Sequence, residues 1–495
     1  MTRPTYLQSD TTFTQAEADL LVLFFHEEDF DADHDVFKTL EAQTSCDTIA
    51  IAKAEKFAAK SGQTLLFRGL SNLATARLLF VGLGAEEDAS NASMIEAGTR
   101  AAREARKLNA STMAVKFPSK VNTFAQQIAL GIARGAYHYG AYITPKEDAY
   151  QGIESVTFLT DDGGDFERTQ KLAAAIAIAR DLVNTPPQDL YPETMADEAM
   201  KIAHAHGLDH KIFDDAELEA KGFNLIMAVG KGSARKPRLI HLTYTPENGK
   251  YSHTIAFVGK GVTFDTGGNN IKTGGFMYHM HSDMAGGAAV LGAASAIGAL
   301  KPAGVRVLFI VAAAENSVSG EAMRPNDIYR GYGDQTVEIG NTDAEGRLCL
   351  ADALAYAQEL GAETIIDLAT LTGACVVALG EYTSGLFTDS EELHGELSQS
   401  IEQSGEDFWR LPLHKKLDKQ LDSQVADMKN IGSRYGGAIT AALFLKRWVK
   451  IDRWAHFDIA APAYFESPQD DMAAGGTGFG VTTLVQLTET IAKNQ

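Results

Sequence analysis

The chain has 495 residues, of which 45% are hydrophobic and 22% charged, and its formal net charge is -21. This length exceeds one ordinary hydrophobic core, so we expect two or more domains of a globular protein. The negative charge argues against non-specific binding to nucleic acid or to anionic membranes, because both depend on patches of lysine and arginine. Three scattered cysteines exclude a disulfide scaffold and form no CxxC metal pair.

The beginning of the chain shows no recognisable targeting segment. The apolar run Leu20–Phe25 starts too late and is too short for a signal peptide, and it cannot span a bilayer. A cytoplasmic protein in a reducing compartment is therefore expected.

The first 165 residues alternate short apolar runs with helical patterns. The predicted elements are strands at Leu20–Phe25, Leu65–Phe67, Leu78–Val81 and Met113–Val115, and a helix at Met94–Leu108. This pattern predicts a smaller N-terminal α/β domain over residues 1–165, with a role in assembly or regulation. Its Gly82-Leu83-Gly84 lacks the third glycine and the acidic partner of a dinucleotide-binding motif, so no chemistry is assigned to it.

A polar, glycine-rich break at residues 161–165 ends this domain. The helical pattern that follows covers residues 166–183 and stops before Asn184-Thr185-Pro186-Pro187. We interpret this helix as a linker, and residues 184–495 as a second domain that carries the chemistry.

The second domain alternates strands with helices. Its predicted strands are Leu239–Tyr244, Thr254–Val258, Val305–Ala312, Thr364–Ala369 and Ala455–Ile459, with helices such as Ala285–Ile297 and Leu348–Leu360. This alternation predicts a largely parallel sheet with helices on both faces. Polar, glycine-rich stretches follow three strands, at 260–268, 315–320 and 370–373. Ligands bind at the carboxyl ends of such strands, so a site is expected there.

The most informative stretch is Asn341–Leu348, which spaces Asp343, Glu345 and Arg347 two residues apart. If this segment is extended, the three side chains share one face. Two converging carboxylates repel each other unless a cation lies between them, and the neighbouring arginine would bind an anion. The stretch therefore predicts a divalent metal site beside an anion site.

A second polar stretch, Val258–Gly268, leads to Lys272 and Asp283. A phosphate-binding loop is excluded, because Gly261 stands where serine or threonine is required and the spacing differs. The two stretches together place four carboxylates and three cations at one sheet edge: Asp265, Asp283, Asp343, Glu345, Lys260, Lys272 and Arg347. Solvated loop charges would explain any one of these residues, but not all seven together. Carboxylates bind hard divalent cations, and zinc or manganese accept mixed oxygen and nitrogen donors.

These motifs resemble the leucyl aminopeptidase family, the dinuclear metallopeptidases of family M17. The resemblance rests on Asn341–Leu348 and on 260–268, and it extends from about Pro186 to Phe479. Further matching segments are 312–316, 322–325, 370–374 and 454–460. The resemblance implies an N-terminal α/β domain and a C-terminal catalytic α/β domain with a mostly parallel central sheet.

The resemblance also implies the roles of the charged residues. Asp265 and Glu345 match bridging ligands of two metals, and Asp343 matches a ligand of the more exchangeable metal. Lys260 and Asp283 match ligands of the more tightly bound metal. Because an ammonium group cannot ligate a metal, Lys260 would have to be deprotonated. The metals would be Zn²⁺ or Mn²⁺, with Mg²⁺ or Co²⁺ as further candidates at the exchangeable site.

Lys272 and Arg347 match the two catalytic cations of the family. Two metals would generate hydroxide near neutral pH, and one would also bind the free α-amine of the peptide. Lys272 would stabilise the developing oxyanion. Arg347 would hold a bicarbonate that acts as the base, a role implied by the resemblance alone.

The pocket for the first side chain of the substrate is implied in the same way. Its matching residues are Met280, Thr370, Gly373, Ala460 and Ala463. Some relatives carry a larger methionine at the last of these positions, so a wider pocket for leucine or another bulky apolar residue is expected.

The segment 278–283 departs from the family pattern. His279 and His281 stand where relatives have acidic or basic residues. The two histidines could add a ligand or a pH-sensitive group, or they could be a local substitution at the mouth of the site, which we favour. His253 and His456 are predicted to be strand residues and not ligands.

The predicted function is that of a metal-dependent aminopeptidase, a hydrolase acting in peptide catabolism on short peptides with a free N-terminus. The resemblance implies a homohexamer built as a dimer of trimers. We expect no membrane partner, and the negative charge argues against a nucleic-acid partner. One alternative is a narrow dipeptidase, for example for Cys-Gly, that uses the same site. Another is an additional DNA-binding role, against which the charge argues.

Overall fold

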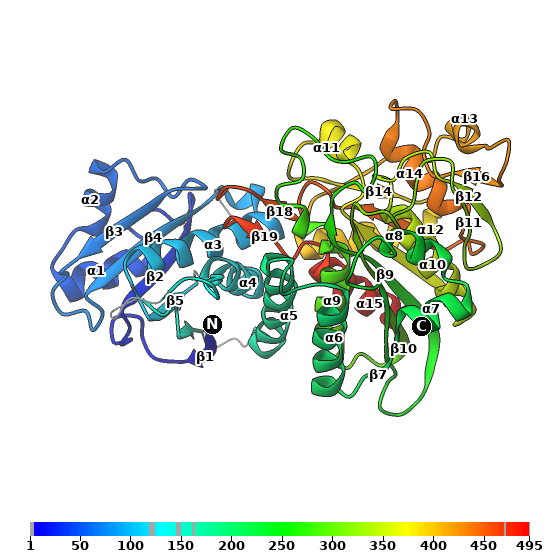
Figure 1. The fold of residues 1–495 in the computed structure, drawn as a ribbon. Helices are drawn as coiled ribbons and strands as arrows, with labels where there is room; N and C mark the ends of the chain where they lie inside the picture. Colours follow the sequence, from blue (N-terminus) through cyan, green and yellow to red (C-terminus); the bar gives the residue numbers. More distant parts are fainter. Residues whose placement is uncertain (1–3, 118–123, 145–149, 161–163, 470–471, 495) are drawn as a thin grey trace. The chain divides into compact units, whose positions relative to one another are not determined.

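The computed structural model describes residues 4–117, 124–144, 150–160, 164–469 and 472–494 (Figure 1). These residues form two compact units, one within 1–174 and 468–473, the other within 175–467 and 474–495. Helix α5 (Phe166–Asn184) runs from the first unit into the second. Part of the polar break predicted at 161–165 lies outside the described residues.

The first unit contains a six-stranded sheet in the order β1-β6-β5-β2-β4-β3. Its elements are β1 (Thr5–Ser9), β2 (Leu20–His26), α1 (Asp35–Thr44), α2 (Thr48–Ala54), β3 (Thr64–Arg68), β4 (Arg77–Gly84), η1 (Glu86–Asp88), α3 (Asn91–Lys107), β5 (Thr112–Lys116), α4 (Ala125–Ala136) and β6 (Ser155–Leu159). Strand β2 is buried along its whole length, and its alternate side chains enter two different hydrophobic clusters. The unit is therefore an α/β domain, as predicted, and its helices lie on both faces of the sheet.

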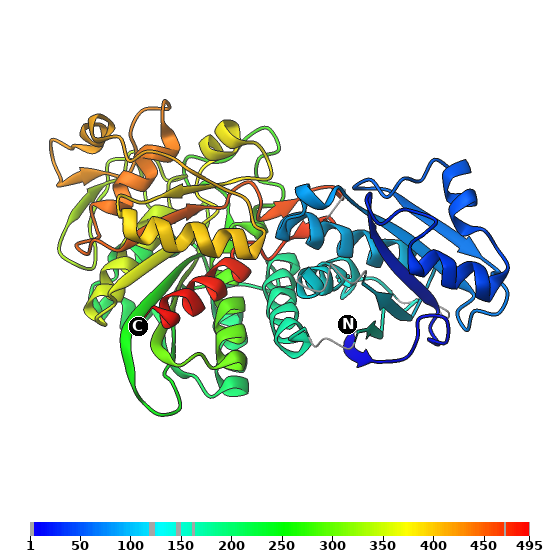
Figure 2. The ribbon, with the colours of Figure 1, turned by 180° about the vertical axis from the view of Figure 1, so that it is seen from behind.

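The second unit contains an eight-stranded sheet in the order β15-β14-β17-β13-β9-β10-β8-β7 (Figures 1 and 2). Its strands are β7 (Asp209–Phe213), β8 (Arg238–Tyr244), β9 (Tyr251–Asp265), β10 (Gly304–Asn316), β13 (Thr364–Ala369), β14 (Ser384–Phe387), β15 (Phe408–Arg410) and β17 (Trp454–Asp458). The four central strands are mutually parallel, whereas β8 and β14 pair antiparallel with their inner neighbours. The predicted mostly parallel sheet is confirmed.

The helices of this unit pack on both faces of the sheet. They are α6 (Pro192–His206), α7 (Asp215–Lys221), α8 (Asn224–Gly230), η3 (Met280–Ser282), α9 (Ala285–Leu300), α10 (Gly346–Glu359), α11 (Gly373–Leu379), α12 (Glu391–Ser404), α13 (Lys415–Asp418), η4 (Lys419–Leu421), α14 (Gly437–Lys446) and α15 (Val481–Lys493). Residues of α10 share a hydrophobic cluster with Ala256 and Val258 of β9. Helix α9 instead lies against Gly259, which points to the opposite face of the strand.

Three shorter strand pairings complete the described part of the second unit. The three-stranded sheet joins β11 (Ile328–Arg330), β12 (Thr336–Glu338) and β16 (Met428–Lys429), and the two-stranded sheet joins β18 (Tyr464–Phe465) to β19 (Gly475–Gly476). Across the described part of the chain, no helix is both long enough and apolar enough to cross a membrane.

Two local predictions were wrong. Strand β9 continues to Asp265, so Lys260 and Asp265 belong to the strand and not to a loop after it. The stretch 341–348 is not extended: residues 342 and 343 form a turn, Glu345 has helical backbone angles (φ -80, ψ -37), and Arg347 lies within α10. Asp343, Glu345 and Arg347 therefore do not alternate along one face of a strand.

Candidate metal centre

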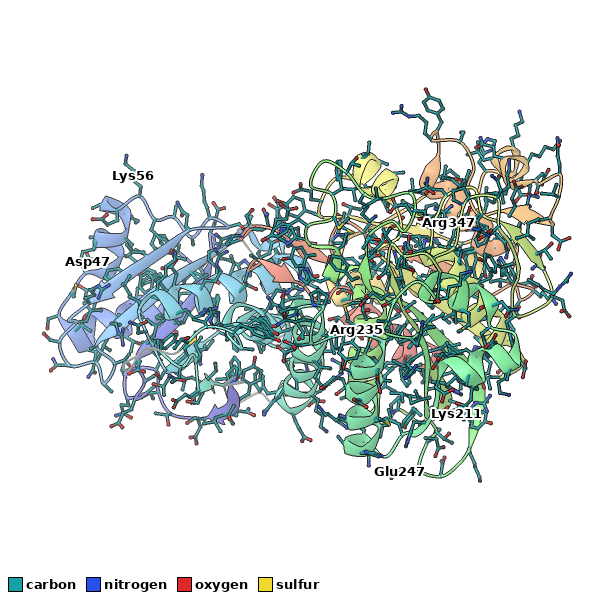
Figure 3. All side chains as sticks on the ribbon, viewed as in Figure 1. Asp47, Lys56, Lys211, Arg235, Glu247 and Arg347 are labelled. Carbon is teal, nitrogen blue, oxygen red and sulfur yellow. The ribbon has the colours of Figure 1, made fainter. Side chains whose placement is uncertain are left out.

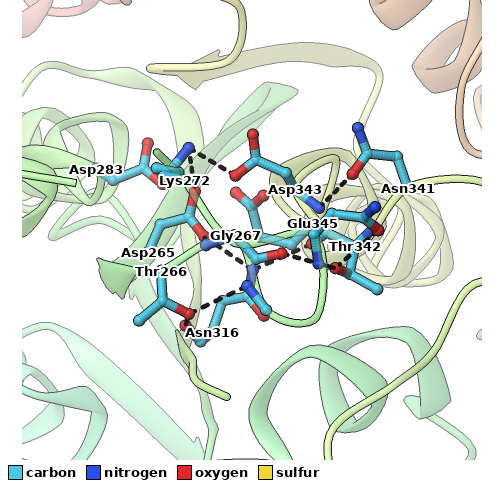
Figure 4. A network of polar contacts seen from close by, with 12 residues as sticks. Asp265, Thr266, Gly267, Lys272, Asp283, Asn316, Asn341, Thr342, Asp343 and Glu345 are labelled. Atoms are coloured by element: carbon cyan, nitrogen blue, oxygen red, sulfur yellow. Dashed lines mark hydrogen bonds and ion pairs between the residues drawn. The ribbon is translucent and has the colours of Figure 1, made fainter. Parts of the chain in front are cut away.

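Four carboxylates converge at the carboxyl ends of the central strands of the second unit (Figure 4). Asp265 ends β9, Asp283 follows η3, Asp343 lies in the turn before α10, and Glu345 precedes the first residue of α10. Carboxylate oxygens of Asp265, Asp283 and Glu345 lie within 4.8 Å of one another, and all three residues are buried. Such a concentration of buried acids requires a cation.

Two lysines contact these carboxylates. Lys260 Nζ lies 2.7 Å from Asp283 Oδ1 and 2.9 Å from Glu345 Oε1. Lys272 Nζ lies 2.8 Å from Asp265 Oδ2 and 2.7 Å from Asp343 Oδ1. Each ammonium group thus bridges two carboxylates, and the structure brings six of the seven predicted charged residues into one cluster.

The electrostatics of the cluster follow from burial and charge. Burial alone would lower the pKa of Lys260, but the carboxylates of Asp283, Glu345 and Asp265 raise it above its ordinary value. Burial and the charge of Asp265 raise the pKa of Glu345, although the two lysines oppose this rise. The carboxylates therefore favour positive charge in their midst.

The donor set fits a divalent cation. It offers hard carboxylate oxygens together with one amine nitrogen, which is a combination that zinc and manganese accept. Oδ2 of Asp283 is buried and has no hydrogen-bond partner among the described residues, so it is free to bind an ion.

Glycines make room for this arrangement. Gly267 has a φ of +83, and a Cβ there would lie 2.7 Å from Oδ1 of Asp343. A Cβ on Gly346 would lie 2.5 Å from Cε and 2.7 Å from Nζ of Lys260. The sequence analysis missed Gly346, although its position directly after Glu345 is a visible signal.

Neutral side chains hold the carboxylate-bearing segments together (Figure 4). Asn316 Nδ2 donates to Asp265 Oδ1 at 2.8 Å and to the carbonyl of Thr342 at 3.1 Å. The Thr342 hydroxyl donates to the carbonyl of Gly267 at 2.6 Å and accepts from the backbone N–H of Asn270 at 2.8 Å. These contacts fix the end of β9 to the turn that carries Asp343.

Arg347, labelled in Figure 3, belongs to α10 and is buried. Its Nη1 donates to the carbonyl of Asn430 at 2.9 Å, and its Nε has no hydrogen-bond partner among the described residues. Burial lowers the pKa of Arg347 to about 10, although Glu345 and Asp458 oppose the shift. A buried guanidinium with an unused N–H donor fits an anion.

The five predicted pocket residues lie after β13, after β17 and in η3. Thr370 follows β13, donates from Oγ1 to Asp283 Oδ1 at 2.8 Å, and accepts at its carbonyl from Lys260 Nζ at 2.9 Å. Gly373 begins α11, and a Cβ placed on it would meet nothing within 4 Å. Ala460 and Ala463 lie between β17 and β18, and Met280 begins η3. Of these five residues, Thr370 alone has a side-chain hydrogen bond to a carboxylate of the cluster, and Met280 accepts at its carbonyl from the backbone N–H of Asp283.

The two unusual histidines pack against a tyrosine. His279 Nδ1 lies 3.0 Å from the hydroxyl of Tyr464, and the ring of His281 meets the Tyr464 ring edge-on at 5.4 Å. Within the described residues, neither histidine joins the group of acids that could hold a metal. His456 and His253 lie in β17 and β9, as predicted, and His456 Nδ1 contacts Asp367 at 2.6 Å in the core.

Comparison with known proteins confirms the resemblance found in the sequence. The pattern described as "Cytosol aminopeptidase family, catalytic domain" matches residues 177–485, and that of the family's N-terminal domain matches residues 21–146. A probable cytosol aminopeptidase of Thermosynechococcus vestitus is 41% identical over 459 residues, which cover 91% of this chain and 92% of the relative. One from Aquifex aeolicus is 40% identical over 461 residues, covering 92% and 93%.

Solved structures are similar over nearly the whole chain. A mutant of tomato leucine aminopeptidase matches with a TM-score of 0.89 and 35% identity, covering 99% of this chain and 97% of that one. The bottromycin maturation enzyme BotP in complex with Mn matches with a TM-score of 0.84 and 34% identity, covering 96% and 100%. Sequence and architecture thus agree over both units.

Proposed function

The chain belongs to the cytosol aminopeptidase family, whose members are metal-dependent aminopeptidases, and on that premise we propose that it removes bulky apolar N-terminal residues such as leucine from short peptides by means of a two-metal site. The observation that carries the proposal is the cluster of Asp265, Asp283 and Glu345, whose carboxylate oxygens lie within 4.8 Å of one another. Lys260 contacts two of the three acids.

In this proposal, Lys260 and Asp283 would hold one metal, Asp343 would hold the more exchangeable one, and Asp265 and Glu345 would serve as ligands for the pair. Zn²⁺ or Mn²⁺ suits the oxygen and nitrogen donors, and the similar enzyme BotP has been solved with Mn. When bound, two such ions would acidify a water molecule and polarise the scissile carbonyl. Lys260 would serve as a ligand only as the neutral amine, because an ammonium nitrogen has no lone pair.

Lys272 is suited to stabilise the charge that develops on the scissile carbonyl oxygen. It is partly exposed, and its Nζ lies within 2.8 Å of Asp265 and Asp343, so it can reach a substrate held at the carboxylates. A preorganised cation in a partly buried site stabilises such charge more than water does.

Arg347 is suited to hold an anionic base. Its unused Nε donor and its burial support bicarbonate as that anion, which would accept the proton of the attacking water. The four carboxylates of the cluster would be occupied as ligands, so none of them would be available as the base.

The preference for bulky apolar first residues rests on the surroundings of the pocket residues. Ala463 is buried and small, and nothing lies within 4 Å of a Cβ placed on Gly373. These small residues would leave room for leucine or methionine beside Thr370. A substrate whose first side chain is one methylene smaller would be cleaved about 10- to 200-fold less efficiently.

Hydrolysis of leucine p-nitroanilide tests the proposal. We expect cleavage that Mn²⁺ or Zn²⁺ stimulates, that Glu345→Ala reduces by at least about 100-fold, and that N-acetylation of the substrate abolishes, because the free amine would bind at the metals. A protein that binds metal but cleaves only Cys-Gly among many substrates would be the narrow dipeptidase. Absence of metal binding would refute the site itself.

The assembly proposed from the family resemblance is a hexamer of two trimers acting in the cytoplasm. Such a closed assembly would restrict entry to short or flexible peptides with a free N-terminus. Sedimentation velocity on the purified protein measures the subunit number directly, and a monomer would contradict this part of the proposal.

A further inference from the structure

The turn that carries two of the acids lies outside regular secondary structure. Strand β12 ends at Glu338 and helix α10 begins at Gly346. Residues 339–345 between them belong to neither a strand nor a helix. Glu345 occupies the N-cap position of α10, but its side chain makes no capping hydrogen bond. The positions of Asp343 and Glu345 must therefore be fixed by contacts from elsewhere in the fold.

Asn430 supplies such contacts through its side-chain amide. Its Oδ1 accepts from the backbone N–H groups of Gly340 at 2.8 Å and Asn341 at 3.3 Å. Its Nδ2 donates to the carbonyls of Asn341 at 2.7 Å and Ala344 at 3.2 Å. The side chain is fully buried, and both donors and both acceptor positions are used.

The location of Asn430 explains how it reaches the turn. Strand β16 pairs in parallel with β12 through Val337–Met428 and Glu338–Lys429. The backbone N–H of Asn430 then donates to the carbonyl of Glu338 at 3.1 Å, which is the last backbone contact of this pairing. Beyond that point, hydrogen bonds from the side chain of Asn430 to the backbone of residues 340–344 replace the pairing between strands.

The backbone of the same residue holds the guanidinium. Nη1 of Arg347 donates to the carbonyl of Asn430 at 2.9 Å, and within the described residues the guanidinium makes no other hydrogen bond. One residue thus contacts both the turn that carries Asp343 and Glu345 and the side chain of Arg347.

We propose that Asn430 is a positioning residue of the metal centre, which sets the places of Asp343, Glu345 and Arg347 relative to one another. The proposal rests on the proposed function, because it assigns those three residues to the metals and the anion. All four side-chain hydrogen bonds of Asn430 go to backbone groups of residues 340–344, and none goes to a carboxylate of the cluster. Loss of a residue that orients ligands in this way costs about 10- to 100-fold in metal affinity or activity.

The test compares Asn430→Ala and Asn430→Asp with the wild type. Aspartate keeps the acceptor for Gly340 and Asn341 but loses both donors, whereas alanine loses all four contacts. We expect each variant to bind Mn²⁺ about 10- to 100-fold more weakly, measured from the electron paramagnetic resonance signal of free Mn²⁺. At saturating Mn²⁺, kcat should fall while KM changes little, because the carboxylates and Arg347 are displaced but the pocket residues are not.

Glu406→Ala is the matched control. Glu406 is buried and accepts from the backbone N–H groups of Gly480 at 2.8 Å and Thr483 at 3.1 Å, at the start of α15. Its loss should lower the unfolding temperature without weakening Mn²⁺ binding. If Asn430→Ala binds Mn²⁺ as tightly as the wild type while its unfolding temperature falls like that of the control, Asn430 has only a structural role and the proposal fails.

Hydrogen exchange separates this proposal from the proposed function. In the metal-free protein, Asn430→Ala should speed exchange of the Gly340 and Asn341 amides, whereas Asn430→Asp should leave them protected. Failure of the wild type to bind either Mn²⁺ or Zn²⁺ would refute the proposed function. Unchanged exchange at residues 340–341 in Asn430→Ala would refute the positioning role whether or not metal binds.

Discussion

At the scale of single residues, the space around Lys260 is the feature most open to test. Gly346→Ala would place a methyl group 2.5 Å from Cε of Lys260, so the amine must move away from Asp283 and Glu345. Alanine ordinarily stabilises a helix by about 1 kcal/mol relative to glycine, so a loss of function could not be attributed to a weaker α10. We expect Mn²⁺ affinity and kcat/KM for leucine p-nitroanilide each to fall by at least about tenfold.

Gly395→Ala is the control for this change. Gly395 lies inside helix α12, and nothing lies within 4 Å of a Cβ placed there. The same substitution should therefore stabilise the protein by roughly 0.5–1 kcal/mol and leave Mn²⁺ binding unchanged. Equal Mn²⁺ affinity in Gly346→Ala and the wild type would show that Lys260 is not held at the carboxylates as described.

At the scale of elements, a buried carboxylate joins α10 to α8. Asp352 in α10 accepts from the backbone N–H groups of Leu225 and Ile226, at the start of α8, and of Tyr332. Burial raises the pKa of Asp352 to about 7, although these backbone donors lower it. In the unfolded chain the pKa is about 3.9, so the folded state binds the proton more tightly.

The contribution of Asp352 to stability is fully present below about pH 4 and is lost as the pH rises towards 7, at up to about 1.4 kcal/mol per pH unit. Asp352→Asn removes this titration. Between pH 4.5 and 7, the free energy of unfolding in urea should therefore fall less for this variant than for the wild type. Parallel pH profiles for the two proteins would contradict the raised pKa.

The elements also show where prediction from sequence succeeded. The strands and the parallel sheet were predicted because alternating and continuous apolar runs report burial directly, as in Leu20–Phe25 and Thr364–Ala369. The charged residues were predicted because they gather in polar, glycine-rich stretches near strand ends, and their roles were predicted because these motifs resemble a known family. The turn into α10 was predicted wrongly, because the spacing of Asp343, Glu345 and Arg347 suits a strand as well as a helix start.

The role of Asn430 could not be predicted from local patterns. Its side-chain partners lie 86 to 90 residues away in the sequence, and nothing near Asn430 marks it as different from other buried asparagines. Gly346 poses the same difficulty, because the side chain that needs its space comes from β9. Contacts of this kind join residues that are far apart in the sequence, so no short stretch of the sequence predicts them.

At the scale of the whole molecule, the two units should respond differently to metal. All three tryptophans (Trp409, Trp448 and Trp454) and all proposed ligands belong to the second unit. Tryptophan fluorescence therefore follows the unfolding of that unit alone, and calorimetry follows both. Mn²⁺ at 100 times its dissociation constant should stabilise the second unit by about 2.7 kcal/mol, because it binds the folded state only.

The transition of the first unit should stay in place, and a chelator should reverse the shift seen by fluorescence. Glu345→Ala should abolish that shift, because one of the three clustered carboxylates is lost. If Mn²⁺ instead moved both transitions equally, the two units would unfold as one cooperative body. If the shift survived in Glu345→Ala, the stabilising ion would bind outside the cluster of Asp265, Asp283 and Glu345.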